Sequence, residues 1–214
     1  MSKNVKIIIS FIILFIGLFI FASEYFTSKK IAVYDYMNEL YYKEEVVVAD
    51  IENIEETKEK IENNEEDSQD TSYNNVIENK SIYIGYLSIP DINLKKGFTE
   101  INSKYNTVSR NIEILSSYDY PDKENGNVIF AAHSGNSSVS YFNKLHLIGV
   151  GTYVYIDYEG INYTYEIKDI YEVEKTGTAE IKRRKGVSTI TLITCTKNNN
   201  DTQTIYIGEL INKD

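Results

Sequence analysis

The sequence is poor in cysteine, histidine and positive charge, and each shortage excludes a class of site. Cys195 is the only cysteine among the 214 residues, so an intramolecular disulfide is impossible. With one cysteine and two histidines, zinc would need carboxylates to complete its shell, and none lies at a recognisable ligand spacing. Lys and Arg number 22 against 32 Asp and Glu, which argues against a nucleic-acid partner because such proteins cluster Lys and Arg against phosphates. We therefore predict no metal, no other cofactor and no nucleic acid.

The N-terminus carries a long hydrophobic run. Ile7–Ala22 is apolar except for Ser10 and Gly17, which is roughly enough for one bilayer crossing. A secretory signal peptide would show a small-x-small cleavage site, and Phe21–Glu24 matches one poorly. We therefore predict that residues 1–27 form a cytoplasmic tip and an uncleaved transmembrane anchor.

The charges beside this run favour one orientation. Lys3 and Lys6 precede the run and Lys29 and Lys30 follow it, while the acidic residues further on count little for orientation. We expect a single-pass protein of the cell membrane with its N-terminus inside and its C-terminal domain outside the cell. In an exported domain the unpaired thiol of Cys195 is either buried and inert or kept for its reactivity.

Residues 28–76 differ in composition from the C-terminal part of the chain. Apolar residues recur at roughly three- and four-residue spacings from Ser28 to about Lys60, which predicts a stalk helix. Residues 51–75 are too polar and acidic to bury a core, so we interpret them as a linker. An acidic tract that binds a partner is the alternative. The third segment, residues 77–214, is then the folded domain.

That domain reads as all-β. From Ser81 onward, short runs rich in Ile, Val, Thr and Tyr are separated by Gly, Asn and Asp. Glu159-Gly160 predicts a hairpin, and Ser137–Leu147 is expected to form a short helix. About eight strands predict a closed β-barrel with short helices, because closure removes exposed sheet edges. The strands are expected at Ile82–Ile89, Ile112–Ser116, Val128–Ala132, Thr152–Tyr158, Ile161–Ile170, Ser188–Thr194 and Thr204–Ile211.

Two of these strands end in residues that can do chemistry. His133 follows one apolar run, in Ala-Ala-His-Ser-Gly, and Cys195 ends another, in Thr-Leu-Ile-Thr-Cys. A strand end fixes a side chain while the following loop opens it to substrate. A nearby imidazole can hold a thiol as thiolate and then protonate a leaving amine, so this pair suffices for acyl transfer. His146 lies inside the expected helix and is interpreted as a packing or surface residue, and Ser134 lacks the Gly-x-Ser-x-Gly elbow of a serine nucleophile.

The two segments, in this order and spacing and behind an N-terminal anchor, resemble the sortases of Gram-positive bacteria. The resemblance covers roughly Ile82–Ile211. It implies an eight-stranded barrel and a reaction in which a cysteine attacks a Thr–Gly type bond in the C-terminal sorting signal of a secreted protein. The thioacyl-enzyme then passes the chain to an amine of the cell-wall precursor or of a pilin. By motif match, Cys195 is the nucleophile and His133 the general acid or acid/base.

The sequence departs from the family pattern at one position. Sortases carry an arginine roughly ten residues after the cysteine, where it steadies substrate or oxyanion, and here no arginine follows Arg184. Three explanations remain open. Gln203 or Thr204 substitutes as a neutral donor, and together with Thr194 these are the predicted substrate-binding residues. Alternatively a cation from Lys182–Lys185 or Lys197 reaches the site, or the enzyme is slow or inactive.

The segment 171–185 falls where sortases place a loop of the substrate groove, and we expect selectivity there. A solvated basic hairpin is the alternative. Two rival functions also remain: a thiol peptidase whose thioester is resolved by water, and a non-catalytic barrel that binds a peptide at the cell surface, which the missing arginine would favour.

Overall fold

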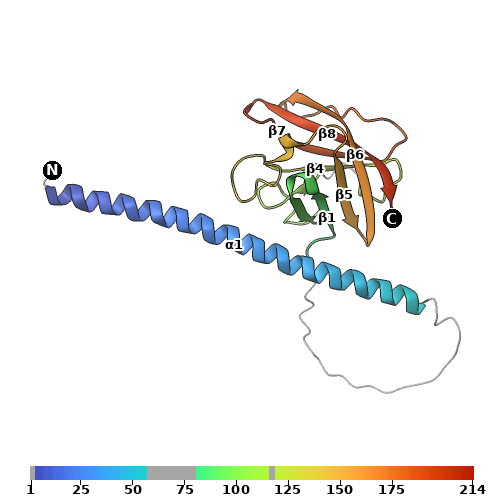
Figure 1. Cartoon of the computed structure of the whole chain (residues 1–214), viewed down its shortest axis with the longest axis horizontal. Coiled ribbons are helices and arrows are strands. Elements are labelled where there is room, and N and C mark those ends of the chain that lie inside the picture. The colour runs from blue at the N-terminus through green and yellow to red at the C-terminus, as the bar shows by residue number, and fades with distance from the viewer. Residues whose placement is uncertain (1–2, 57–80, 116–118) are drawn as a thin grey trace, which may run out of the picture.

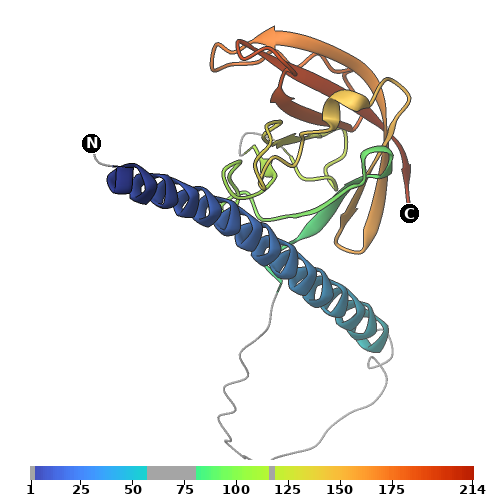
Figure 2. The same cartoon turned by 60° about the vertical axis from the view of Figure 1, so that its left-hand side comes forward.

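The computed structural model describes residues 3–56, 81–115 and 119–214. One long helix, α1 (Lys3–Glu56), precedes an eight-stranded sheet that curls into a nearly closed barrel (Figures 1 and 2). The helix continues through residue 27, where the predicted anchor ends, and through the described part of the predicted stalk. Most of the predicted acidic linker lies outside the described residues.

The continuity of α1 follows from its composition. Between Lys3 and Glu56 the sequence has no proline and a single glycine, Gly17, so nothing removes a helix hydrogen bond or loosens the backbone over several turns. A helix of 54 residues is about 80 Å long. Its stretch Ile7–Lys43 includes a window of mean hydropathy 2.6 and is long and apolar enough to cross a membrane, by length and composition.

The barrel strands pair in the order β2-β1-β5-β6-β8-β7-β4-β3. Every neighbouring pair is antiparallel except β4 and β7, which run parallel. The predicted eight-stranded barrel is confirmed, and it is nearly closed, with β2 and β3 at the two ends of the strand order. The strands are β1 (Gly85–Ile89), β2 (Leu94–Phe98), β3 (Glu113–Ile114), β4 (Asn127–Ala131), β5 (Tyr153–Tyr158), β6 (Ile161–Glu174), β7 (Thr189–Cys195) and β8 (Thr202–Lys213), with short 3₁₀ turns η1 (Pro90–Ile92) and η2 (Leu145–Leu147).

Apolar side chains at alternate strand positions fill the barrel. On β4 and β7 the core takes Val128, Phe130, Ile190 and Leu192, while the residues between them point to the other face of the sheet. The predicted β5–β6 hairpin is present, and its turn residues Glu159 and Gly160 both have positive φ, 51° and 74°.

The predicted strand set and one predicted helix need correction. β2 is absent from the predicted strands, because its sequence Leu-Lys-Lys-Gly-Phe shows two lysines and a glycine in five residues. The predicted helix Ser137–Leu147 is wrong except for the turn η2. Serine side chains compete for local bonds there, since Ser137 Oγ and Ser140 Oγ lie 2.9 Å apart, and the Phe142 amide donates to the His133 carbonyl at 3.0 Å instead of to a helix.

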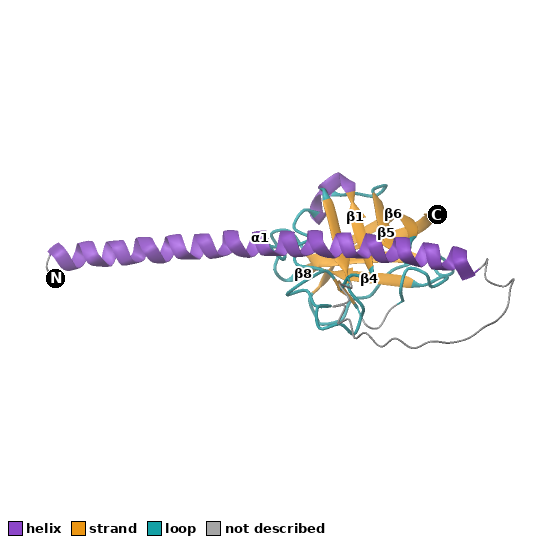
Figure 3. Cartoon of the chain, turned by 90° about the horizontal axis from the view of Figure 1, so that it is seen from below, coloured by secondary structure: helices purple, strands orange, loops and turns teal. Residues whose placement is uncertain are grey.

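The helix does not only carry the barrel; it packs against it. Figure 3 shows α1 running across the barrel beside β1, with a long portion extending past it toward the N-terminus. Asn38 and Tyr42 on α1 are buried, as are Tyr83 and Lys96 on the barrel side. Since β2 is an edge strand, contact with α1 also shields an exposed sheet edge.

Candidate active site

The two reactive residues end neighbouring parallel strands. In the β4–β7 ladder, Ala131 pairs with Ile193, and the next amide, that of Ala132, donates to the Ile193 carbonyl at 3.3 Å. Adjacent strands lie about 4.8 Å apart. One further step along both strands reaches His133 and Cys195, so the two residues leave the sheet side by side.

Alternation along the strands places both residues on the same face. Val128 and Phe130 point into the core, so Ile129 and His133 belong to the outer face of β4. By the same count, Ile193 and Cys195 belong to the outer face of β7. His133 is exposed and Cys195 is half-buried, so neither residue is sealed inside the barrel.

Three hydrogen bonds fasten the strand ends around the pair. Thr194 Oγ1 donates to the Ala132 carbonyl at 2.8 Å, and Ser134 Oγ donates to the Cys195 carbonyl at 2.9 Å. The third is the bond from the Phe142 amide to the His133 carbonyl. Thr194, predicted as substrate-binding, is buried, and its hydroxyl is engaged in the bond to the Ala132 carbonyl. The backbone at His133 and Cys195 is thus held from both sides.

The register of β8 places Gln203 and Thr204, the two residues that could replace the missing arginine, on opposite faces of the sheet. Gln203 pairs with Cys195 across the antiparallel β7–β8 ladder, and Thr204 pairs with Thr194. Directly opposed residues project to one face with Cβ atoms about 4.5–5.5 Å apart. Gln203 therefore lies beside the thiol on the outer face. Thr204 shares the inner face with Thr194, and its hydroxyl lies 2.9 Å from that of Thr196.

A scan against protein-family models matches residues 87–211, more than half of the chain, to the sortase domain. The chain belongs to the sortase family. Sortases are cysteine transpeptidases, and the match makes this chain a member of that enzyme class. A search of curated proteins found no significant match.

Solved sortase structures share the barrel. Sortase C1 from Streptococcus agalactiae is 26% identical with a TM-score of 0.56, covering 63% of this chain and 70% of that one. Sortase C1 of GBS pilus island 1 is 24% identical with a TM-score of 0.55, covering 62% of this chain and 66% of that one. Sortase C-1 from Actinomyces oris is 22% identical with a TM-score of 0.55, covering 61% of this chain and 75% of that one. These likenesses show that the fold is the sortase barrel.

The arginines of the β6–β7 connection contact the barrel far from Cys195. Arg183 Nη1 donates to the Gly126 carbonyl at 3.0 Å and to Thr189 Oγ1 at 3.2 Å, and Arg184 pairs with Glu209 at 2.7 Å. Thr189 begins β7 and Cys195 ends it, six residues and about 20 Å away. The prediction that a cation from this run reaches the site is therefore wrong for both arginines.

The same connection meets the outer face of the sheet at the start of β7. Ile129 and Ile205 are fully buried although they point away from the core cluster, so another part of the chain covers them. Arg183 holds the connection at this face through its bonds at the start of β7.

A cation that the sequence did not single out lies nearer the thiol. Lys175 follows β6, and its Nζ donates to the Asn200 carbonyl at 2.7 Å while its amide donates to the Asp201 carbonyl at 2.9 Å. It thereby joins the end of β6 to the loop between Cys195 and Gln203. Among the residues that the structure describes, no three His, Cys, Asp or Glu side chains gather closely enough to hold a metal ion.

Proposed function

We propose that this chain is a membrane-anchored sortase that cleaves a C-terminal sorting signal through a thioacyl-enzyme on Cys195. The observation that carries the proposal is the parallel pairing of β4 and β7, which brings the ends of two strands some sixty residues apart in sequence to one edge of the barrel. The rigid ladder behind each residue favours a defined distance between thiol and imidazole, which acyl transfer requires.

The first half-reaction forms the thioester. The Cys195 thiolate attacks the scissile carbonyl carbon, and the electrons of the C=O bond move to oxygen. When the tetrahedral intermediate collapses, the C–N bond breaks and His133, as imidazolium, gives its proton to the departing amine. The enzyme then holds the substrate's new C-terminus as a thioester on Sγ.

The second half-reaction transfers the chain. A primary amine of the cell-wall precursor or of a pilin attacks the thioester carbonyl, neutral His133 takes the amine's proton, and the Cys195 thiolate leaves. Water attacking in place of the amine would give hydrolysis, which is the thiol peptidase alternative. The acceptor therefore decides between transfer and hydrolysis, with the same residues in the same roles.

Gln203 takes the place of the family's arginine in this proposal. Its amide group is carried by the residue paired with Cys195, so its NH₂ can donate to the carbonyl oxygen of a bound thioester or oxyanion. A neutral donor is about half as strong as a charge-assisted one. We expect a slower enzyme than one with arginine at this position. Thr204 is less suited to this role because its hydroxyl is engaged with Thr196.

Anchoring rests on the apolar part of α1. Large hydrophobic side chains from Ile7 to Phe21 are exposed around the helix, which suits lipid contact. We propose residues 1–27 as the cytoplasmic tip and membrane anchor, 28–76 as a connecting segment and 77–214 as the catalytic domain outside the cell. The substrates are then secreted proteins that bear a sorting signal.

The test uses the full chain in detergent micelles with a library of sorting-signal peptides. Mass measurement should find a thioester on the wild-type chain and none on Cys195→Ala. Added amine should shift the products from hydrolysed peptide to amine conjugate, whereas amine-independent products indicate a peptidase. If peptides bind but no adduct forms under any condition, the chain is the non-catalytic barrel and the proposal fails.

A further inference from the structure

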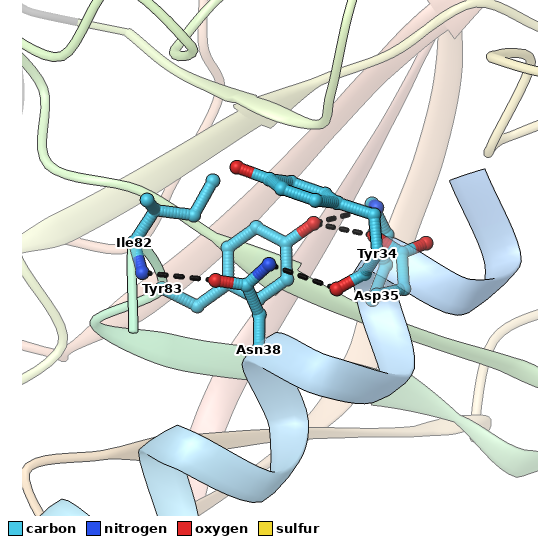
Figure 4. Close-up of polar contacts among 6 residues, drawn as sticks. Tyr34, Asp35, Asn38, Ile82 and Tyr83 are labelled. Carbon is cyan, nitrogen blue, oxygen red and sulfur yellow. Dashed lines mark hydrogen bonds and ion pairs between the residues drawn. The ribbon is translucent and has the colours of Figure 1, made fainter. Parts of the chain in front are cut away.

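The docking of α1 on the barrel fixes which end of the barrel faces the bilayer. A buried polar cluster forms the contact. Lys96, 4% exposed, forms an ion pair with Asp35 of α1 and donates to the Tyr83 hydroxyl at 2.9 Å. Tyr83 in turn donates to Asp35, as Figure 4 shows. A buried ammonium this well paired is costly to separate from its carboxylate, so the contact is firm.

A second set of bonds prevents rotation about this point. The side-chain oxygen of Asn38, Oδ1, accepts from the Ile82 amide at 3.1 Å, as Figure 4 shows. The backbone carbonyl of Asn38 accepts from Ser81 Oγ. One turn further along, Tyr42 donates to Asp157 at 2.9 Å, at the β5–β6 hairpin. Two attachment points about 10 Å apart along the helix, at residues 35 and 42, define the direction of the barrel relative to α1.

The attachment nearer the anchor involves the segment that carries His133. The Lys96 ammonium lies 4.6 Å from the centre of the Tyr141 ring, and the next residue, Phe142, binds the His133 carbonyl. The attachment further from the anchor, at Tyr42, involves the β5–β6 turn. Strand β6 starts at that turn and ends at Glu174, which pairs with Thr202 beside the loop that follows Cys195. The thiol therefore lies at the end of the sheet opposite the Tyr42 attachment.

The figures agree with this order along the helix. In Figures 1 and 3 the C-terminus, where β8 ends, lies at the side of the barrel away from the N-terminus of α1. β8 begins at the other side, and Gln203 near its start pairs with Cys195. The edge with Cys195 thus faces back along α1 toward the apolar stretch.

We propose that α1 holds the barrel with its Cys195 edge turned toward the bilayer surface, so that the site accepts a peptide presented close to the membrane. The inference rests on the proposed membrane anchoring. About 20 residues of helix span the hydrocarbon core, so an anchor that ends near Phe26 leaves Asp35 about 13 Å further along the helix axis. The barrel is therefore docked next to the headgroup region. A scissile bond tethered at the surface meets the thiol at a high effective concentration, whereas a bond far from the membrane gains nothing.

The test measures which end of β8 lies nearer the lipid. In a Cys195→Ser background, Lys197→Cys and Lys213→Cys give matched single-thiol chains. Both lysines are exposed, Lys197 lies in the loop before β8, and Lys213 is the last residue of β8. Each full chain is labelled with a fluorophore and reconstituted in vesicles that carry a quencher on the lipid headgroup. The probe at 197 should lose a larger fraction of its emission than the probe at 213. Equal quenching, or stronger quenching at 213, would overturn the proposal.

Two further measurements test membrane insertion and the docking of α1 separately from the orientation of the barrel. Vesicle flotation reports insertion, and a chain that fails to float contradicts the anchoring instead of the orientation. Asp35→Ala releases the ion pair and should reduce the difference between the two probes while the chain still floats. A difference unchanged by Asp35→Ala would show that the docked cluster does not set the orientation.

Discussion

The thiol and the imidazole of this sortase are positioned through the backbone of the strand ends that carry them. Thr194 and Ser134 bind carbonyls on the opposite strand, so each strand end is tied to the other just where the reactive side chains begin. Such fastening limits the motion of the pair without burying it. In the proposed mechanism, the substrate approaches His133 and Cys195 from this outer face.

Replacing the two reactive residues should abolish or sharply lower transfer. We expect Cys195→Ala to remove thioester formation entirely, and His133→Ala to lower the transfer rate about 10²–10⁴-fold, because the leaving amine then departs without a proton donor. His146→Ala is the matched control, since this histidine is exposed in η2. Rates from peptide transfer and thermal unfolding of each variant decide. An unaffected rate in His133→Ala would contradict the assigned role.

Position 203 should matter more for rate than position 204. Gln203→Ala removes the donor beside the thiol and is expected to lower kcat by about 10²-fold. Thr204→Val removes the bond to Thr196 and should cost about 1 kcal/mol of stability with little change in kcat. Steady-state kinetics with one sorting peptide separates the two effects. The reverse pattern would assign the arginine's role to Thr204.

The β6–β7 connection is fastened to the barrel through one guanidinium. Arg183 donates to the carbonyls of Asn125, Gly126 and Val187 and to the Thr189 hydroxyl. All four contacts are made by the same nitrogen, Nη1. The residue that the sequence offered as an aid to catalysis instead ties the β6–β7 connection to the start of β7.

Loss of this anchor should lower stability without touching the chemistry directly. Arg183→Ala removes the donor to the Asn125 and Val187 carbonyls, whereas the Gly126 carbonyl keeps its bond from the Thr189 amide. We expect a loss of about 1–3 kcal/mol in the free energy of unfolding. Arg184→Ala removes only a surface pair with Glu209 and should cost about 0–1 kcal/mol. Urea unfolding of both variants provides the comparison. Equal losses would mean that the anchor at Arg183 contributes no more than the surface pair.

Strand β8 contains a buried tyrosine that should make the free energy of unfolding fall at alkaline pH. Burial raises the pKa of Tyr206 from 10.0 to about 12. Its contribution is fully present below pH 10, because the phenol is then neutral whether the chain is folded or unfolded. It is lost as the pH rises from 10 to 12, because the unfolded chain releases a proton that the folded chain keeps.

The barrel should therefore lose stability above pH 10, and Tyr206→Phe should make the decline shallower. Denaturant midpoints measured at several pH values between about 8 and 12 test this, with Tyr153→Phe as the control because that tyrosine is exposed. An identical pH slope in Tyr206→Phe and the parent chain would contradict the assignment of the shift to Tyr206.

At the scale of the molecule, the ion pair between Asp35 and Lys96 joins the helix to the barrel. Removing one partner of a buried pair costs about 3–5 kcal/mol, and Asp35 is still 30% exposed, so we expect Asp35→Ala to cost somewhat less than this. The double variant Asp35→Ala with Lys96→Met should recover most of the loss, because no charge stays buried alone. Hydrogen exchange at β2 amides in the full chain measures the contact. A double variant as weak as the single one would show that the charge is not the source of the cost.

The sequence by itself determined the features that depend on local pattern. Alternating apolar residues predicted most strands, Glu159-Gly160 predicted the hairpin, and the motifs around His133 and Cys195 predicted the family. Helical spacing predicted a helix after the anchor. In each case the signal lies within a few residues, where backbone geometry and solvent exposure act directly.

Only the tertiary structure decided the features that depend on register and on distant partners. Gln203 and Thr204 are neighbours in sequence, and their opposite faces follow from how β8 pairs with β7. β2 escaped prediction because the buried state of Lys96 depends on Asp35, 61 residues away on a helix outside the barrel. A charge can be buried only where its partner is brought to it, and no local pattern records which distant element will supply that partner.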